Sequence, residues 1–579
     1  MAFELGHYTL AIDGKGLPDK QLIGGKAWSI ARMRALGLSV PPAFVITARA
    51  CSAYLEHGTL PAGLADELAR GIAWLEEASG CTFGDGSRPL LVSVRSGAAI
   101  SMPGMMDTVL NLGITDATEA ALAGATGDAR FARDTHRRFL DLYGRIVLKA
   151  VTPELDEHAT PGDWRRLVED AAGAALPADP RAQLLSAVQA VFESWNSRRA
   201  RRYRQHHGIP DTLGTAVTVQ AMVFGNLDDR SGTGVLFSRN PLTGERAPYG
   251  EYLARAQGED VVSGKFTPQP LSTLAVAMPA VHAELLAAAE TLERENGDVQ
   301  DIEFTVQGGT LYLLQTRAAK RAPAAAVRFA VDMVEEGRID TATALSRVSA
   351  EQVRTLLSPR LANGAAAAAD CLASGEAACQ GVGVGVVVTN TDEAERRALA
   401  GEAVVLARAT TSPDDVHGMI ACRAVVTEQG GATSHAAVVS RALGVACVVG
   451  CGDGSVTALE GRTVTVDGAS GKVYAGALPV VAPDENADPH LAALTRWAEA
   501  AAPIEVRAAG AADIDLGAVD GGEDIERLPA LLAGKTSAHG GAIASDGGVR
   551  AALAAGVRTI VASPRLPVLL AALEASREQ

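Results

Sequence analysis

The chain has 579 residues, 47% of them hydrophobic, which indicates about three or four globular domains and argues against a disordered protein. Its formal net charge of −16 excludes nucleic acid as an expected partner, because the phosphate backbone would repel it. Seven scattered cysteines without zinc-ligand spacing, no signal-peptide pattern and no apolar run of about 18 residues together predict a cytoplasmic protein with reduced thiols and no membrane contact.

The N-terminal half predicts two groups of strands separated by helices. Apolar runs at residues 43–47 and 90–94 are typical of buried strands. Residues 27–36 predict a helix that ends near a glycine. Residues 116–205 are rich in Ala, Arg and Leu and predict mostly helices, whereas residues 211–320 return to strand patterns.

The second half begins with predicted helices at residues 321–375. They end in an alanine-rich stretch at 362–369, which we expect to link two domains. Strands and helices then alternate over residues 376–478. Near the C-terminal end we expect strands at 504–507 and 558–561 and helices at 549–555 and 568–573.

The most informative segment is residues 427–441, which contains a single histidine. His435 follows a Gly-Gly turn and precedes an apolar run that can start a helix. A helix N-terminus favours a nearby anion, and an imidazole is a competent nucleophile near neutral pH. The alternative is an ordinary helix start, with Thr433 or Ser434 as the capping residue and His435 incidental.

Three other segments contain residues that are able to bind phosphate. Gly24-Gly25-Lys26 precedes a predicted helix, and Arg95 follows a buried strand, where its guanidinium can meet an anion. Residues 225–234 form a glycine-rich turn whose backbone N–H groups can approach phosphate, although the turn lacks the Gly-Lys-Ser/Thr ending of a P-loop. Each segment also fits an ordinary turn, and residues 225–234 fit a simple hairpin.

Polar side chains on two neighbouring predicted strands form a sharper pattern. Alternation places Asp301 and Glu303 on one face of a strand, and Gln315 and Arg317 share a face of the strand that follows. Oxygen ligands of this kind suit Mg²⁺ bound to nucleotide phosphates. The alternative is a solvated polar face on a two-stranded ribbon.

Long stretches around these residues resemble the pyruvate phosphate dikinase and phosphoenolpyruvate synthase family. The stretches are residues 96–113, 231–245, 249–262, 300–321, 411–416, 430–444 and 447–452. The resemblance implies an ATP-grasp domain that binds ATP and Mg²⁺, followed by a swivelling domain. It also implies that His435 carries phosphate between two active sites.

The resemblance further assigns roles in the ATP site. The matched residues are Lys26, Arg95, Asp301, Glu303, Gln315 and Arg317. Lys26 and Arg95 would hold phosphates, and Glu303 and Gln315 would hold the metal. Asp301 and Arg317 would complete the site. Thr433 matches a threonine that is phosphorylated for regulation in plant and some bacterial relatives; the alternative is that it only caps the helix.

These patterns predict a multidomain α/β and α+β protein. We expect an N-terminal ATP-grasp domain at residues 1–345 with a helical insertion at about 116–205. A linker at 346–375 and a phosphohistidine swivel domain at 376–480 follow, and residues 481–579 form a short remnant of an (α/β)8 barrel.

The barrel of the family binds pyruvate or phosphoenolpyruvate and needs at least about 200 residues. Residues 504–508 resemble the entry into its first strand, and residues 539–541 and 556–565 resemble its last strand. Ala562 stands where the family has an acid cysteine, and alanine cannot protonate an enolate. The resemblance implies an internal deletion that removed the phosphoenolpyruvate and pyruvate site.

The functional hypothesis is therefore a phosphotransferase that uses Mg-ATP, together with phosphate, and gives AMP and pyrophosphate. His435 would pass its phosphoryl group to an acceptor, either a small molecule or a protein. Two alternatives stay open: a dikinase completed by a partner chain that carries the barrel, and a non-catalytic nucleotide-binding regulator. We expect the apolar faces of the remnant to pack on each other, on the swivel domain or in a homodimer.

Overall fold

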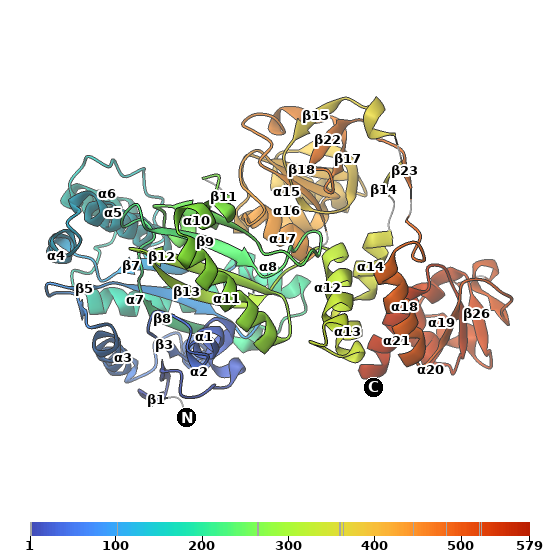
Figure 1. The fold of residues 1–579 in the computed structure, drawn as a ribbon, viewed down its shortest axis with the longest axis horizontal. Coiled ribbons are helices and arrows are strands. Elements are labelled where there is room, and N and C mark those ends of the chain that lie inside the picture. Colours follow the sequence, from blue (N-terminus) through green and yellow to red (C-terminus); the bar gives the residue numbers. More distant parts are fainter. Residues whose placement is uncertain are drawn as a thin grey trace.

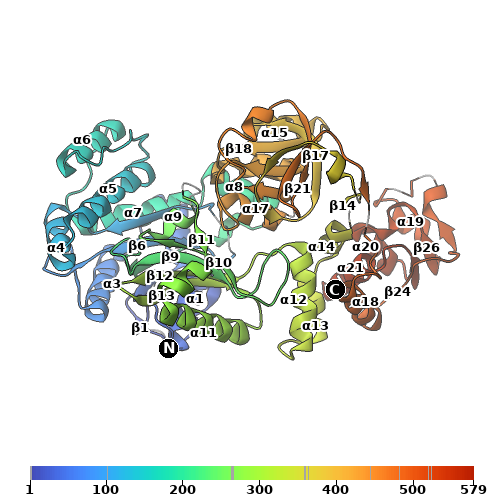
Figure 2. The same ribbon diagram turned by 45° about the horizontal axis from the view of Figure 1, so that its top comes forward.

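The computed structural model describes residues 3–100, 102, 104–262, 266–357, 360–362, 364–443, 445–481, 483–519, 521–522 and 524–578. It is a multidomain α/β structure. Figures 1 and 2 show a large N-terminal body in blue to green, an orange body beside it and a red C-terminal body. Within the described ranges, no helix is both long and apolar enough to span a membrane.

The first sheet of the N-terminal body has six antiparallel strands in the order β1–β2–β3–β8–β6–β7. They are β1 Phe3–Glu4, β2 Thr9–Ile12, β3 Ala43–Ile46, β6 Val92–Gly97, β7 Thr108–Leu112 and β8 Ala216–Ala221. Helices α1 Lys20–Ala35, α2 Ala48–His57, α3 Leu64–Ser79 and α7 Pro180–Ser194 pack against it, and β4 Thr82–Phe83 pairs with β5 Pro89–Leu90. The strand predicted at residues 43–47 is confirmed, and the one predicted at 90–94 starts two residues later, as β6.

Helix α1 differs from the predicted helix at residues 27–36, because it starts seven residues earlier, at Lys20. Gly24 interrupts it with φ 76° and ψ 162°. A Cβ on Gly24 would lie 1.7 Å from the carbonyl oxygen of Gly97, so only glycine lets the helix approach the end of β6 this closely. The contact, reinforced by a 2.9 Å bond from the Gly25 N–H to the Ala98 carbonyl, brings Lys26 beside Arg95.

The second sheet has five antiparallel strands in the order β11–β10–β9–β12–β13. They are β9 Gly232–Phe237, β10 Tyr249–Ala254, β11 Gln269–Pro270, β12 Gln300–Gln307 and β13 Thr310–Ala318, with helices α9 Gly258–Val262, α10 Ser272–Ala277 and α11 Pro279–Asn296. In the β12–β13 register, Asp301 lies opposite Arg317 and Glu303 opposite Gln315. The predicted convergence of these four side chains on neighbouring strands is confirmed.

The glycine-rich segment at residues 225–234 is not a hairpin, since β8 belongs to the first sheet and β9 to the second. Its glycines allow neighbouring strands and side chains to pack closely against the backbone. A Cβ on Gly232 would lie 2.1 Å from the Tyr252 hydroxyl, and one on Gly234 would lie 2.4 Å from the Glu251 carbonyl oxygen. The segment therefore joins two sheets that must lie near each other.

The residues predicted to be mostly helical, 116–205, form helices as expected. Besides α7, they are α4 Asp116–Thr126, α5 Ala129–Ile146, α6 Pro161–Ala172 and α8 Arg198–His206. After β13, helices α12 Pro323–Glu335, α13 Thr341–Arg347 and α14 Ala350–Leu357 lead out of the N-terminal body. The predicted linker at 346–375 thus begins with a helix.

The orange body, residues 371–475, is named here the histidine unit. Its eight strands have the order β15–β22–β21–β17–β18–β19–β20–β16, with β17 to β20 in parallel. The strands are β15 Cys371–Ser374, β16 Glu376–Cys379, β17 Val382–Val388, β18 Val404–Arg408, β19 Ala424–Thr427, β20 Ala446–Val449, β21 Thr463–Asp467 and β22 Lys472–Ala475. Its helices are α15 Thr391–Leu399, α16 Val416–Ala421 and α17 His435–Leu443.

The two chain segments that enter and leave the histidine unit run side by side. Strand β14 Arg360–Leu361 pairs antiparallel with β23 Val480–Val481. The Ala362 N–H adds a 2.8 Å bond to the Pro479 carbonyl. The histidine unit is therefore tethered by one short two-stranded ribbon, which Figure 1 shows between the orange and red bodies.

The red body, residues 489–577, is named here the tail unit. Its sheet is parallel, in the order β24–β27–β26–β25. Its elements are α18 Pro489–Ala501, β24 Glu505–Arg507, β25 Ile514–Asp515, α19 Leu528–Leu532, β26 Ser537–His539, α20 Asp546–Ala554, β27 Thr559–Val561 and α21 Leu566–Arg577. The predicted strands and helices near the C-terminal end are confirmed.

The apolar faces of the tail unit pack on each other, as expected, and also on α12 to α14, which the sequence did not predict. Leu345 and Val353 share one buried cluster with Leu494, Leu569 and Ile560. These helices therefore cover part of the surface that we expected to meet the swivel domain or a second subunit.

Candidate active site

One cavity of about 840 Å³ lies between the two sheets of the N-terminal body and reaches the histidine unit. All eight residues selected from the sequence line it: Lys26, Arg95, Asp301, Glu303, Gln315, Arg317, Thr433 and His435. They come from α1, β6, β12, β13 and the start of α17. The fold thus gathers side chains that are more than 400 residues apart in sequence.

Cations and carboxylates alternate along the cavity wall. Arg95 forms a 3.0 Å ion pair with Glu303, and Arg317 forms a 2.7 Å ion pair with Asp301. Burial, followed by the nearby Arg95, holds the pKa of Lys26 well below its usual value, although Glu303 opposes this shift. Burial raises the pKa of Glu303, but the cations around it outweigh burial and keep its carboxylate ionised.

The acidic side of the cavity has one carboxylate oxygen without a partner. Asp301 Oδ1 is buried and accepts no hydrogen bond from the described residues, while Asp301 Oδ2 accepts a bond from Arg317. Glu303 and Gln315 lie opposite each other on the adjacent strands. Two carboxylates and an amide oxygen are a donor set that fits Mg²⁺, and a buried oxygen without a partner fits a missing cation.

His435 is the first residue of α17, and its ring is held from one side. Its Nδ1 lies 3.2 Å from the Thr411 hydroxyl, whose oxygen can accept a hydrogen bond from Nδ1–H. In that tautomer the ring's free lone pair is on Nε2. Nε2 is buried and has no hydrogen-bond partner among the residues that the structure describes. Burial lowers the pKa of His435 to about 4, which the charge of Asp415 only partly opposes. The ring is therefore neutral at pH 7, and His435 is one of the residues that line the cavity.

Gly104 of the N-terminal body lies directly against this ring. Its φ is +69°, and a Cβ there would lie 3.0 Å from His435 Cδ2 and 3.2 Å from Nε2. A side chain at residue 104 would thus occupy the space that an incoming group needs. The flanking residues Ser101 and Pro103, part of the resembling stretch 96–113, lie outside the described residues.

Thr433 does not cap α17. Ser434 Oγ accepts the 3.5 Å bond from the Ala437 N–H, whereas the Thr433 hydroxyl donates to Glu251 on β10 of the N-terminal body. Glu251 is buried, and burial raises its pKa to about 7, although the bond from Thr433 opposes the shift. Thr433 therefore lies in the contact between the two bodies rather than serving only its own helix.

Comparisons with known proteins agree with this geometry. The family described as "Pyruvate phosphate dikinase, AMP/ATP-binding domain" matches residues 20–80 and 58–283, and "PEP-utilising enzyme, mobile domain" matches residues 400–471. The chain is 44% identical to a chloroplastic pyruvate, phosphate dikinase of Flaveria pringlei over 84% of its own length and 54% of the relative. It is 43% identical to the pyruvate, phosphate dikinase of Rhizobium meliloti (strain 1021), over 84% of this chain and 59% of the relative.

The chain belongs to the pyruvate phosphate dikinase family. This is a family of kinases and phosphotransferases, as the resemblance of the sequence predicted. The chain spans between half and two thirds of the length of these relatives, 54% for the Flaveria protein and 59% for the Rhizobium protein.

The dikinase-family site includes residues that the sequence did not single out. Thr411 and Gly104 contact His435, and Glu251 holds Thr433. Gly104 was part of a resembling stretch, but nothing local marked it, because its role depends on a residue more than 300 positions away. Of the glycine-rich segment at 225–234, only Thr233 and Gly234 line the cavity, so its predicted phosphate role stays a prediction.

The contact between the two bodies combines apolar and acidic groups. Met105 and Tyr203 pack with Val416 and Met419 of the histidine unit.

Beside them, the Tyr249 hydroxyl donates a 2.7 Å bond to Glu376, which also accepts a 3.0 Å bond from the Ala432 N–H. Arg441 is buried close by and donates to the carbonyls of Ala378 and Ala432. The family site is thus closed by a specific docking surface.

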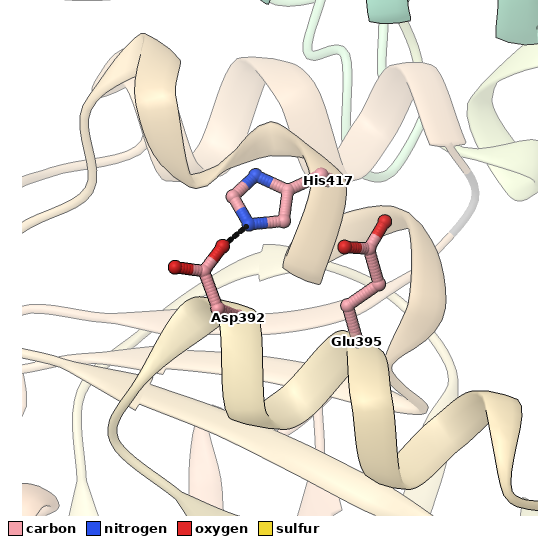
Figure 3. A group of neighbouring side chains, drawn as sticks. All are labelled: Asp392, Glu395 and His417. Carbon is pink, nitrogen blue, oxygen red and sulfur yellow. Dashed lines mark hydrogen bonds and ion pairs between the residues drawn. The ribbon is translucent and has the colours of Figure 1, made fainter.

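Within the described residues, one group outside the cavity has metal-ligand types: Asp392, Glu395 and His417 (Figure 3). His417 Nε2 lies 2.8 Å from Asp392, and Glu395 lies 3.6 Å from Arg202. Ion pairing within the histidine unit, and between Glu395 and Arg202 of α8, therefore accounts for the arrangement.

Proposed function

We propose that this chain transfers phosphate from Mg-ATP to Nε2 of His435. The observation that carries the proposal is the cavity in which a neutral His435, with Nε2 unpartnered, faces the same space as Lys26, Arg95 and Arg317. The corresponding domains are an ATP-grasp domain at residues 1–345 and a phosphohistidine swivel domain at 376–480, joined by a linker at 346–375.

The chain's own residues supply charge neutralisation and positioning. Lys26, Arg95 and Arg317 hold the phosphates and offset the charge of the transferring group. Asp301 Oδ1, Glu303 and Gln315 would hold Mg²⁺, which would neutralise phosphate charge when bound. Thr411 holds the ring so that Nε2 attacks, and Gly104 leaves the space through which the phosphoryl group arrives.

The phosphorylated histidine must then leave the cavity. The ribbon of β14 and β23 is a narrow attachment that permits the histidine unit to swing. Of the expected tethers at 362–375 and 480–490, residues 371–374 belong to β15 and residues 489–490 to α18, so only the parts outside these elements can act as tethers. Nε2 of His435 attacks the β phosphorus of ATP and releases AMP. Inorganic phosphate, as co-substrate, then accepts the γ-phosphoryl group to form pyrophosphate, and the β-phosphoryl group stays on the histidine. The acceptor is a small molecule or a protein. A catalytic role is favoured over a nucleotide-binding regulator, because the ATP residues and His435 are all in place.

The experiment that tests this function uses ATP labelled at either the β or the γ phosphate, with and without phosphate and pyruvate. With phosphate present, the β label is expected on the protein in an acid-labile, base-stable form and the γ label in pyrophosphate, with AMP as the nucleotide product. Nucleotide binding without any protein labelling would support the regulator instead.

The tail unit bears on the second step, in which His435 passes its phosphoryl group to an acceptor. Its parallel sheet has β24 next to β27, as the first and last strands of a closed barrel would be, which supports a shortened barrel. Ala562 follows β27, at the position of the family's acid cysteine. We therefore expect purified protein to form no phosphoenolpyruvate from pyruvate, ATP and phosphate, while labelling of His435 proceeds.

Enzyme-coupled detection of phosphoenolpyruvate checks this prediction. Adding a chain that carries an intact barrel is the informative second arm, since product formed only then would support a dikinase completed by a partner. Phosphoenolpyruvate formed by the chain alone, at a rate that His435→Asn abolishes, would show that the tail unit is active.

Thr433→Glu is expected to slow the labelling of His435 by about 100-fold or more. The new carboxylate would face Glu251 in the buried contact, where like charges cost most. Thr433→Val, which removes the hydroxyl but adds no charge, is expected to cost less than about tenfold. Equal rates for Thr433→Glu and the wild type, measured by quenched-flow labelling, would argue against a switch at this residue.

Docking of the histidine unit is expected to weaken as pH rises from 6 to 8. Docking raises the pKa of Glu251 from about 4.5 to about 7, so the docked form holds a proton that the open form releases. The stabilisation of the docked form by this proton is complete below pH about 4.5 and lost above pH about 7. Between pH 6 and 8 it predicts about a tenfold fall in the ratio of docked to open protein.

Fluorescence energy transfer between the two bodies measures that ratio. A His435→Asn background removes the opposing titration of the histidine, and Glu376, Tyr249 and Arg441 are the other ionisable groups near Glu251. Glu251→Gln in that background is expected to flatten the profile. A profile that keeps its slope in Glu251→Gln would assign the pH dependence elsewhere.

A further inference from the structure

The segment that leaves the histidine unit is attached to the tail unit by one buried carboxylate. Glu485 is buried, whereas its immediate neighbours in the chain are exposed. Its carboxylate oxygens accept bonds of 2.9 and 3.0 Å from the Arg565 N–H and a bond of 3.1 Å from the Leu566 N–H. These bonds are named here the tether contact. They join Glu485 to the start of α21, 80 positions further along the chain.

The tether contact satisfies the chemistry of a helix start. The first N–H groups of a helix have no acceptor within the helix, and the N-cap residue of α21, Arg565, has a side chain that carries no acceptor. Glu485 supplies the acceptor instead, and its negative charge suits the positive end of the helix dipole. Arg565 Nε also lies 3.7 Å from Glu485. Hydrogen bonding and charge therefore hold the exit segment at this point.

The segment that enters the histidine unit is anchored on the same body. Helix α14, which precedes β14, packs on α21, and its residues Val353 and Leu357 lie in the buried cluster of the tail unit. Beside this cluster, Arg354 forms a 2.6 Å ion pair with Asp546 of α20. Figures 1 and 2 show α14 next to the helices of the tail unit. Both chain segments are thus attached to the tail unit at points close to the ribbon of β14 and β23.

We propose that the tail unit is the fixed base on which the histidine unit swings, and that Glu485 ends the mobile part of the exit segment. The proposal rests on the swing in the proposed function. With the tether contact formed, the three residues 482–484 connect β23 to Glu485, whereas without it the seven residues 482–488 connect β23 to α18. A shorter connection raises the effective concentration of a tethered domain at its docking surface. Glu485 is therefore a positioning residue for phosphate transfer to His435.

Two insertions of the same sequence, Gly-Ser-Gly-Ser, test where the mobile segment ends. Placed between Pro483 and Asp484, the insertion lengthens the connection from three to seven residues and leaves the tether contact in place. It is expected to lower the docked-to-open ratio about threefold, because the probability of closing a flexible connection falls with about the 3/2 power of its length. Placed between Asn486 and Ala487, on the other side of Glu485, it is expected to leave the ratio unchanged.

Fluorescence energy transfer between the N-terminal body and the histidine unit measures this ratio in the full chain. A lower ratio for the first insertion alone is the expected result. Equal effects of the two insertions, whether both lower the ratio or both leave it unchanged, would overturn the proposal. Since neither insertion alters Glu485 or the core of the tail unit, the comparison does not depend on a substitution that could impair folding.

Substitutions at Glu485 give a second, independent measurement. Glu485→Ala is expected to lower the docked-to-open ratio and the labelling rate of His435 together, each about threefold, with the affinity for a non-hydrolysable ATP analogue unchanged. Glu485→Gln keeps an acceptor oxygen and is expected to recover most of the ratio. Asp484→Asn is the matched control, because the Asp484 carboxylate is exposed and bonds to Asn486. Wild-type docking by Glu485→Ala would contradict the positioning role.

Hydrogen exchange tests whether the base stays fixed during the swing. Gly104→Trp is expected to hold the histidine unit open, because a side chain at residue 104 would meet His435. The amide protons of Arg565 and Leu566 are expected to exchange equally slowly in this variant and in the wild type, and faster in Glu485→Ala. Loss of their protection in Gly104→Trp would show that the tether contact breaks on opening, which would overturn the proposal.

The hinge base and the proposed function fail separately. The docked-to-open ratio is measured in a His435→Asn background, so it requires no phosphorylation. A difference between the two insertions, in a protein whose His435 never becomes labelled, would sink the proposed function and keep the hinge base. Normal labelling of His435 together with equal effects of the two insertions would do the reverse.

Discussion

His435→Asn is expected to abolish labelling of the protein from ATP while leaving the affinity for a non-hydrolysable ATP analogue within about threefold. Asparagine fills similar space but has no nucleophilic ring nitrogen. The wild-type ring is neutral, and its Nε2 has no hydrogen-bond partner among the described residues, so the substitution removes the proposed acceptor rather than the nucleotide site. Acid-labile, base-stable radioactivity on the protein is the measurement.

His417→Asn is the matched control for this change. His417 lies on the same unit, but it is bonded to Asp392 and is not part of the cavity lining. It is expected to keep labelling at close to the wild-type rate. Undiminished labelling of His435→Asn would remove the basis of the proposed function, since a residue other than His435 would then be the carrier.

Glu303→Ala is expected to slow labelling by about 100-fold or more and to raise the Mg²⁺ concentration needed for half-maximal rate by at least about tenfold. The substitution removes an oxygen ligand and leaves Arg95 without its 3.0 Å partner. Metal titrations of the labelling rate measure both effects. Both changes are expected together, because the same carboxylate holds the metal and fixes Arg95.

Glu303→Gln tests whether charge or shape is responsible. It keeps an oxygen ligand but loses the negative charge, so an intermediate effect is expected. Glu284→Ala, at an exposed position on α11, is the control for losing a carboxylate outside the cavity. A Mg²⁺ requirement that is unchanged in Glu303→Ala would show that Glu303 does not hold the metal.

The sequence by itself predicted the features that depend on neighbouring residues. Strand alternation placed Asp301 and Glu303 on one face, and the β12–β13 register pairs them with Arg317 and Gln315. The signal was reliable because side chains alternate with a period of two along any strand. The motif around His435 likewise identified the start of α17, since caps and turns are local chemistry.

Only the tertiary structure decided which distant residues meet these groups. Thr433 and Glu251 are 182 positions apart, and their bond turns an expected helix cap into a docking contact. Gly24 lies inside a kinked helix rather than in a preceding turn, because the backbone of Gly97 approaches it closely. Such contacts depend on how separate sheets pack, which no local pattern encodes.

The tail unit shows the same division between local and long-range information. Its strands and helices follow from their apolar patterns, but the burial of Leu345 and Val353 of α13 and α14 against Leu494 and Leu569 does not. An apolar face specifies that it must be covered, and several surfaces of similar chemistry can do so. The surface that covers the apolar face of the tail unit is formed by α12 to α14, because the course of the chain brings those helices next to it.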